Sequence, residues 1–146
     1  MPVLIRPLAA GDHAAWLPLW RGYLDFYRTE VPAAVTTETW RRLLEPEGRI
    51  HGLGAFKSDG QLVGFVHYLF HPVTWSIADR CYLEDLFVAP QARGKGAARA
   101  LIEAVYTAAD AAEADQVYWL TEADNAGARR LYDRVGRLTP FVKYTR

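Results

Sequence analysis

The segment from residue 80 to residue 113 constrains the fold of this chain most strongly. Residues 80–88 (RCYLEDLFV) are mainly apolar and aromatic, which predicts a strand, and Ala89-Pro90 ends it. A turn containing glycine and basic residues follows, and good helix formers then occupy roughly residues 94–113. A strand that leads through such a turn into a long helix is a building unit of α/β domains.

The rest of the chain supplies further strands and helices. Strands are expected at residues 2–8, 51–57, 61–71, 115–121 and 138–145. Ser58-Asp59-Gly60 joins the second and third of these, and Asp-Gly is typical of a hairpin turn. Helices are expected from Asp12, as N-cap, to Tyr27; from Thr36 or Thr37 to Leu44; and over residues 125–135. This order predicts one α/β domain over residues 1–146, built on a mixed sheet.

Composition excludes several classes of protein. Hydrophobic residues make up 51% of the 146 residues, which is enough for the core of one soluble domain. Seventeen basic residues balance seventeen acidic ones, so we expect no nucleic-acid partner. We expect no membrane partner and a cytoplasmic location, because the chain shows neither a bilayer-spanning stretch nor a secretion pattern. Cys81 is expected to be a partly buried thiol, and the spacing of Cys and His predicts no metal site.

The turn before the long helix has the chemistry of an anion site. A helix begins with unpaired N–H groups and a partial positive charge of about half a unit. Gly94 and Gly96 leave no side chain between those donors and a phosphate, and Arg93 and Lys95 add charge. The P-loop pattern is absent, and the third glycine of the dinucleotide fingerprint is replaced by Arg99 in the wrong register. An ordinary helix-start turn is the alternative for this segment taken alone.

Three motifs in sequence order resemble those of the GNAT superfamily of N-acetyltransferases. Gln91, Gly94 and Gly96 are similar to its acyl-CoA signature. Asn125 followed by Tyr132 and Gly136 is similar to its second coenzyme motif. Residues 82–88, together with the aromatic helix before them, look closest to the branch of yeast histone, polyamine and D-amino-acid acetyltransferases, and to the diamine acetyltransferases. The resemblance implies a mostly antiparallel mixed sheet flanked by about four helices, and acetyl-CoA as co-substrate without a metal.

The resemblance also implies roles for individual residues. Tyr132 would donate a hydrogen bond or proton to the departing thiolate, although it could be a core tyrosine beside Leu131 and Val135. Glu84 would be the base, through a water relay, or an anchor for a cationic amine. Backbone N–H groups near residues 86–88 would hold the acetyl group. The cofactor-binding set is then Leu86, Phe87, Val88, Arg93, Gly94, Lys95, Gly96, Ala97, Ala98, Asn125 and Tyr132.

Other candidate residues admit two interpretations. Strand alternation places Glu84 and Asp85 on opposite faces of the sheet. His67 and His71 are about 13 Å apart on one strand, too far to share a metal ion, and are expected to be ordinary strand histidines. The aromatic helix face (Trp16, Trp20, Tyr23 and Tyr27) either packs in the core or lines an acceptor pocket.

The expected activity is acetylation of a primary amine on a small molecule, such as a polyamine or an amino acid. Acetylation of a protein lysine or N-terminus is an alternative, and a non-catalytic acyl-CoA-binding module is an alternative of another class. A homodimer is expected, with the final strand at residues 139–144 as its interface.

Overall fold

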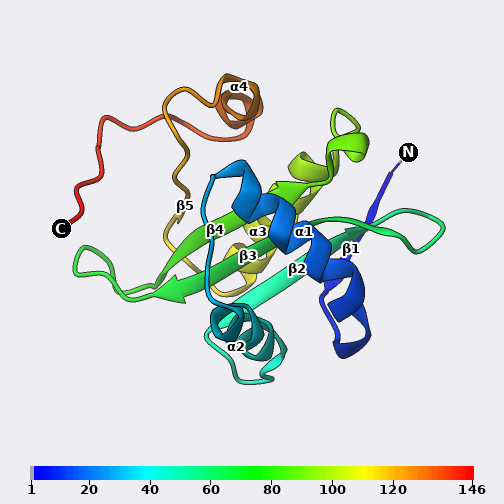
Figure 1. Ribbon diagram of the computed structural model, residues 1–146. Helices are drawn as coiled ribbons and strands as arrows, with labels where there is room; N and C mark the ends of the chain where they lie inside the picture. The colour runs from blue at the N-terminus through cyan, green and yellow to red at the C-terminus, as the bar shows by residue number, and fades with distance from the viewer. Residues whose placement is uncertain (1) are drawn as a thin grey trace.

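The computed structural model of the chain describes residues 2–146 and contains a five-stranded sheet of order β1-β2-β3-β4-β5 (Figure 1). The strands are β1 (Leu4–Pro7), β2 (Ile50–Phe56), β3 (Leu62–His71), β4 (Arg80–Val88) and β5 (Val117–Tyr118). The first four strands pair antiparallel, and β5 pairs parallel to β4. The predicted mixed, mostly antiparallel sheet is therefore confirmed.

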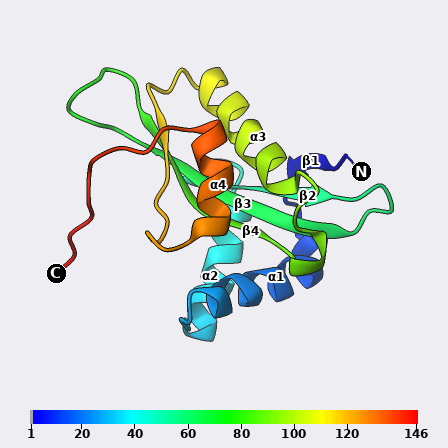
Figure 2. The same cartoon turned by 90° about the horizontal axis from the view of Figure 1, so that it is seen from above.

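Helices cover both faces of this sheet (Figure 2). The four α-helices are α1 (His13–Phe26), α2 (Ala33–Leu44), α3 (Ala97–Ala111) and α4 (Ala126–Val135). Two short 3₁₀ helices, η1 (Ala10–Asp12) and η2 (Pro90–Ala92), precede α1 and α3. Helices α1 and α2 lie on one face and α3 on the other, where the Tyr106 hydroxyl donates to the carbonyl of Val135 and ties α3 to α4.

Aromatic packing joins α1 to the sheet. Trp16 is fully buried, and Trp20 stacks on it with ring centroids 5.6 Å apart. The rings of Trp20 and Tyr23 in turn pack against the ring of Phe65 on β3, with centroids 6.3 and 6.0 Å away. Each such side chain contributes roughly 1.5–3 kcal/mol when it is removed from water. The aromatic stripe of α1 is therefore largely core, and only its C-terminal end reaches the functional region described below.

The opposite face is packed by aliphatic residues of α3. Ala97, Leu101, Ile102, Val105 and Ala109 are all buried and recur at helical spacing. Cys81 lies in the same core with no exposed surface, so its thiol is fully rather than partly buried. Burial raises the pKa of that thiol to about 11, which leaves it protonated and unreactive at neutral pH.

The predicted start of the second helix and the predicted length of the strand at residues 115–121 are wrong, whereas the boundary predicted at Asp12 is correct. Helix α2 begins at Ala33 after Pro32, and Thr36 lies inside the helix, where its hydroxyl accepts the indole N–H of Trp20. Asp12 stands at the N-cap of α1 without capping it, because its carboxylate accepts the Ala9 N–H and pairs with Arg6. The strand expected at residues 115–121 is only the two residues of β5.

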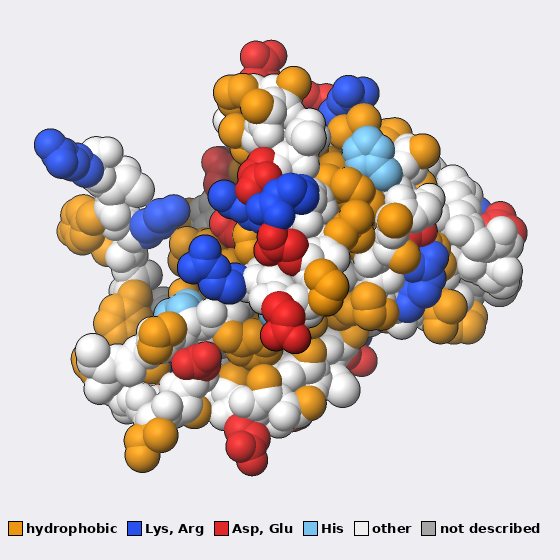
Figure 3. All heavy atoms as spheres, turned by 90° about the horizontal axis from the view of Figure 1, so that it is seen from below, with side chains coloured by type: hydrophobic (Ala, Val, Ile, Leu, Met, Phe, Trp, Pro, Cys, Tyr) orange, Lys and Arg blue, Asp and Glu red, His pale blue; other side chains and the backbone are white. Residues whose placement is uncertain are grey.

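The last predicted strand, at residues 138–145, is not formed. The segment is extended but pairs with no neighbour within residues 2–146, because the β5 strand that would receive it is too short to offer a ladder. It projects from the body with exposed Leu138, Phe141, Val142 and Tyr144 (Figures 1 and 3).

Candidate active site

The sheet opens between β4 and β5. Their pairing consists of Cys81 with Val117 and Tyr82 with Tyr118, and it stops there. The second half of β4 therefore runs without a neighbour on that edge in the described chain. Beyond these two pairs, β4 and β5 are no longer paired with each other.

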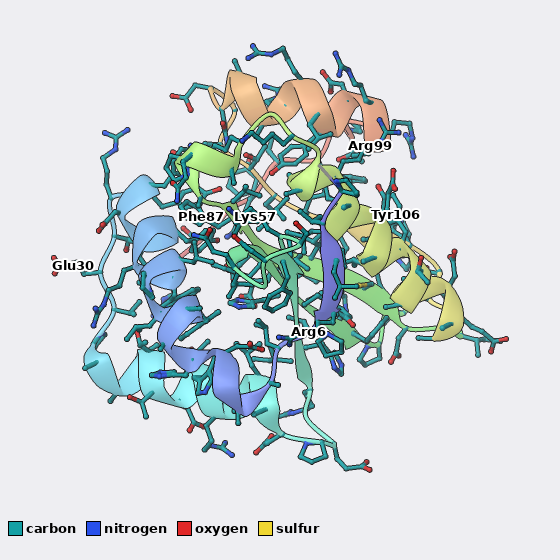
Figure 4. All side chains as sticks on the ribbon, turned by 90° about the vertical axis from the view of Figure 1, so that its right-hand side faces the viewer. Arg6, Glu30, Lys57, Phe87, Arg99 and Tyr106 are labelled. Carbon is teal, nitrogen blue, oxygen red and sulfur yellow. The ribbon has the colours of Figure 1, made fainter. Side chains whose placement is uncertain are left out.

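Backbone donors of β4 face this opening. The N–H of Ala89 donates to the carbonyl of Val63 at 2.8 Å, toward β3. Because donors alternate between the two edges of a strand, the N–H of Phe87 also points to β3, whereas those of Leu86 and Val88 point into the opening. Leu86 and Val88 thus offer the free donors, and Phe87 contributes its ring, which lies beneath α1 (Figure 4) and contacts Tyr23 and Phe65.

The turn before α3 is open to a phosphate. Gly94 and Gly96 have φ angles of 77° and 89°, a left-handed conformation that glycine adopts without strain. A Cβ at either position would meet nothing within 4 Å, so their backbones are accessible from outside. Helix α3 begins directly after Gly96 with Ala97 and Ala98, which aims its first N–H groups at this space.

The two basic residues of the turn differ in their contacts. Arg93 donates from Nε to the carbonyl oxygen of Val88 at 2.9 Å, and its guanidinium lies 5.3 Å from the centre of the Phe87 ring. Its terminal nitrogens remain available to an anion. Lys95 is exposed. A cavity of about 500 Å³ between α1 and this turn is lined by Gly22, Phe26, Phe87, Gln91 and Arg93, among others.

Asn125 and Tyr132 lie across the opening on α4. Asn125 is the N-cap residue of the helix, and its side-chain amide donates to the Thr121 hydroxyl at 3.1 Å. The Tyr132 ring packs edge-on against Trp119 at 5.5 Å. Burial, with a smaller effect of Tyr27, raises the pKa of Tyr132 to about 12. The phenol therefore stays protonated at neutral pH and can donate a hydrogen bond.

Glu84 occupies a β-bulge. Leu83 pairs with Tyr68 and Asp85 pairs with His67, so Glu84 has no residue opposite it in β3. The extra residue reverses the alternation of β4: Cys81 and Leu83 lie in the core on the α3 face, whereas Asp85 and Phe87 contact α1. The prediction that Glu84 and Asp85 face opposite sides is wrong, because strict alternation does not survive a bulge. Burial is the main cause that raises the pKa of Tyr23 on α1, and the charges of Asp85 and Glu84 raise it further.

Asp85 is the centre of a hydrogen-bond network that the sequence analysis missed. Its carboxylate accepts the Tyr23 hydroxyl at 2.6 Å and lies 2.9 Å from Nδ1 of His67. The indole N–H of Trp16 donates to Nε2 of the same imidazole at 3.2 Å. Four residues from three elements are thus joined, and the signal in the sequence is His67 in the middle of a mainly apolar strand. His71, by contrast, bonds the Tyr118 hydroxyl at 2.7 Å near the sheet edge.

Three other acidic residues, Asp25, Glu30 and Glu122, lie on or next to the elements that form the site. Glu30 lies on the outer side of the connection between α1 and α2 and points away from the sheet (Figure 4). Asp25 is also exposed, at the rim of the cavity beside the turn. Glu122, which follows β5, is closer to the opening. Burial is the main cause that raises the pKa of Tyr27, and the charge of Glu122 raises it further. No group of three or more His, Cys, Asp or Glu able to hold a metal is present in residues 2–146.

Comparison with known proteins agrees with this geometry. The family model of the acetyltransferase (GNAT) family matches residues 16–136, which contain the opening, the glycine turn and α4. The chain belongs to the GNAT acetyltransferase family. As a member it is an acyltransferase enzyme. Within the described residues, no helix has the length and apolar character needed to cross a bilayer.

Two curated relatives extend over nearly the whole chain. A D-amino-acid N-acetyltransferase of Saccharomyces cerevisiae is 37% identical over 145 residues, covering 99% of this chain and 90% of the relative. An uncharacterized N-acetyltransferase of Bacillus subtilis is 33% identical, covering 96% and 94%. The first of them agrees with the branch that residues 82–88 and the aromatic helix resemble.

Solved structures share the fold. A ribosomal-protein-alanine N-acetyltransferase from Brucella melitensis biovar Abortus 2308 superposes with a TM-score of 0.80 at 26% identity, covering 98% of this GNAT chain and 97% of its own. The protein AAC(6')-Iy, solved in complex with the bisubstrate analogue CoA-S-monomethyl-acetylneamine, superposes with a TM-score of 0.84. It covers 100% of this chain and 98% of its own at 19% identity, a likeness of fold alone.

Proposed function

We propose that this GNAT enzyme transfers the acetyl group of acetyl-CoA to the primary amine of a small molecule, with amino acids, particularly those of D configuration, and polyamines as the acceptor classes. The observation that carries the proposal is the 37% identity to a D-amino-acid N-acetyltransferase across 99% of the chain. The carboxylates of Glu84 and Asp85 support a cationic acceptor, because both face the α1 side of the opening.

The glycine turn supports acetyl-CoA as the donor. Open backbone at Gly94 and Gly96, the first N–H groups of α3 and the free nitrogens of Arg93 suit a pyrophosphate. The N–H groups of Leu86 and Val88 would bind the thioester carbonyl and the oxyanion that develops there. Asn125 would orient the start of α4 so that Tyr132 reaches the sulfur.

The reaction forms a C–N bond and breaks the C–S bond of the thioester. The acceptor ammonium, with a pKa of about 10 if it is lysine-like, must first lose a proton. Glu84 would pass that proton to solvent through water. Desolvation and then the charge of Asp85 raise the pKa of Glu84, which makes its carboxylate a stronger base. The nitrogen loses its second proton to solvent as the amide forms. Tyr132 would donate its proton to the departing thiolate, which leaves as the free thiol, and Tyr132 would regain a proton from solvent.

A screen of thiol release tests the proposal. Wild-type protein with acetyl-CoA is offered D- and L-amino acids, polyamines, and peptides that present a lysine or a free N-terminus. We expect turnover with at least one small amine that greatly exceeds turnover with the peptides. Preference for a peptide would transfer the assignment to a protein acceptor, the class named for the Brucella structure. Binding of acetyl-CoA without transfer to any amine would instead indicate a non-catalytic acyl-CoA-binding module.

We also propose that the enzyme is a homodimer. The segment at residues 137–146 carries four exposed apolar side chains, of which Phe141 is 80% and Tyr144 is 90% exposed. An extended apolar segment of this kind readily pairs with a second chain. The exposed Trp75 and Ile77, in the connection between β3 and β4, add apolar surface that a second copy could cover.

A further inference from the structure

His67 stands apart from the rest of the core. It is the one buried polar or charged side chain in residues 2–146, with 1% of its surface exposed. Its ring stacks on Phe65 at 4.5 Å and lies against Trp16 and Trp20. An apolar side chain would fill such a position at lower cost, because burying an imidazole requires partners for both of its nitrogens.

The two partners of His67 fix its protonation. Indole N–H groups can only donate, so Nε2 of His67 must accept from Trp16. The single proton of the neutral ring is then on Nδ1, where it donates to Asp85 at 2.9 Å. A second proton on Nε2 would confront the Trp16 donor. These two hydrogen bonds therefore fix one tautomer and one orientation of the imidazole.

Asp85 receives one donor on each oxygen, from Tyr23 at 2.6 Å and from His67. Hydrogen bonds of this kind stabilise the charged form of a carboxylate. No Lys or Arg of the described chain forms an ion pair with Asp85 or with Glu84. Hydrogen-bond donors, and no Lys or Arg, therefore hold the Asp85 carboxylate beside the opening.

The bulge places this charge next to Glu84. Desolvation raises the pKa of Glu84, and the Asp85 charge raises it further. The other titratable groups that act on the pair are Tyr82 on β4, Tyr23 on α1 and Tyr27 directly after α1. All three are neutral phenols, whose pKa values are raised, so Asp85 is the main neighbouring charge that acts on Glu84.

We propose that His67, together with Trp16 and Tyr23, is a positioning residue that holds Asp85 as a fixed, charged carboxylate beside Glu84 and thereby sets the pH range of acetyl transfer. The inference rests on the proposed function, in which Glu84 removes the acceptor proton. Asp85 and Glu84 then titrate as a coupled pair. Loss of a donor to the pair makes its charged form less stable, so the acid limb of kcat/KM moves to higher pH.

Three variants and one control separate positioning from packing. Tyr23→Phe and His67→Phe each remove one donor and retain an aromatic ring. His67→Asn keeps an N–H near the position of Nδ1. The control is Tyr68→Phe, which removes a phenol from the opposite face of β3, adjacent to the bulge. For each protein, kcat/KM is measured against pH, and the side-chain carboxyl titrations are followed by ¹³C NMR.

We expect Tyr23→Phe and His67→Phe to raise the midpoint of the acid limb by about one pH unit, with the carboxyl midpoints moving in parallel. His67→Asn should return both toward wild type, and Tyr68→Phe should leave both unchanged. Lower thermal stability with unchanged midpoints would overturn the proposal and make the network packing only. The proposal would also be overturned if the carboxyl midpoints moved while the pH profile of kcat/KM stayed unchanged. Absence of turnover in wild type refutes the proposed function instead, and the carboxyl titrations alone then decide whether the network sets the charge of the pair.

Discussion

Replacement of Gly96 by Glu tests the phosphate site at the turn before α3 and leaves the fold intact. Gly96 has a φ of 89° and open space around it, so the new side chain meets no clash but adopts a left-handed backbone. That conformation costs an L-residue about 1–2 kcal/mol. A carboxylate at the start of α3 recovers about 0.3–1 kcal/mol from the helix dipole. The net loss of about 1 kcal/mol lowers Tm by roughly 2–4 °C for a chain of this size.

The effect on coenzyme binding should be much larger. Two unit negative charges about 5 Å apart repel by roughly 3 kcal/mol at an effective dielectric constant of about 20. We therefore expect Gly96→Glu to weaken acetyl-CoA binding by roughly two orders of magnitude, as measured by titration calorimetry. Added salt should recover part of the loss because it screens the repulsion.

A matched control exists in the turn between β2 and β3. Gly60 has a φ of 88° and equally open surroundings, so Gly60→Glu carries the same backbone strain and the same added charge far from the turn of α3. It should lose similar stability and keep wild-type affinity. Equal acetyl-CoA affinities in Gly96→Glu and wild type would refute the phosphate site at this turn. Equal losses of acetyl-CoA affinity in Gly96→Glu and Gly60→Glu would refute it as well.

Three further predictions follow from the same geometry. Tyr132→Phe should lower kcat by about 10²–10⁴ while acetyl-CoA affinity stays within a few fold, because only the donor to the thiolate is lost; full activity across pH 6–9 would reject the role. Glu84→Gln should lower the rate most at pH values below the pKa of the amine. It should also abolish the part of the acid limb that belongs to Glu84, whose raised pKa places that limb above the usual carboxyl range. An unchanged pH profile of the rate would make Glu122 the next candidate for the base. Deletion of residues 138–146 should convert a dimer to a monomer by light scattering, and a monomeric full-length chain at micromolar concentration would contradict the dimer.

Local sequence patterns located most of the elements that build the site. The strand at residues 80–88 was predicted to the residue, because Pro90 and the glycine turn mark its end and its composition is apolar. The hairpin around Asp59-Gly60 and the helix after Asn125 were predicted within one residue for the same reason. In each case the determinant is a turn or boundary residue, whose effect is local.

What could not be predicted depends on pairing between distant residues. The bulge at Glu84 is a property of the register between β3 and β4, and a single strand carries no record of it. The network around Asp85 joins residues 51 and 62 positions apart in the sequence. The final strand has the right alternation, but a strand also needs an edge to pair with, and the two residues of β5 do not provide one.

The fate of the acetyl group can be followed in a reaction of the wild-type protein with acetyl-CoA that carries ¹³C in its acetyl group and with the best amine from the screen. Mass spectrometry of the products should show one labelled N-acetyl amine for each free CoA released, in wild type at a rate far above that of Tyr132→Phe. Release of CoA with unlabelled amine would mean that the thioester is merely hydrolysed, and it would contradict the account of this chain as an N-acetyltransferase of small amines.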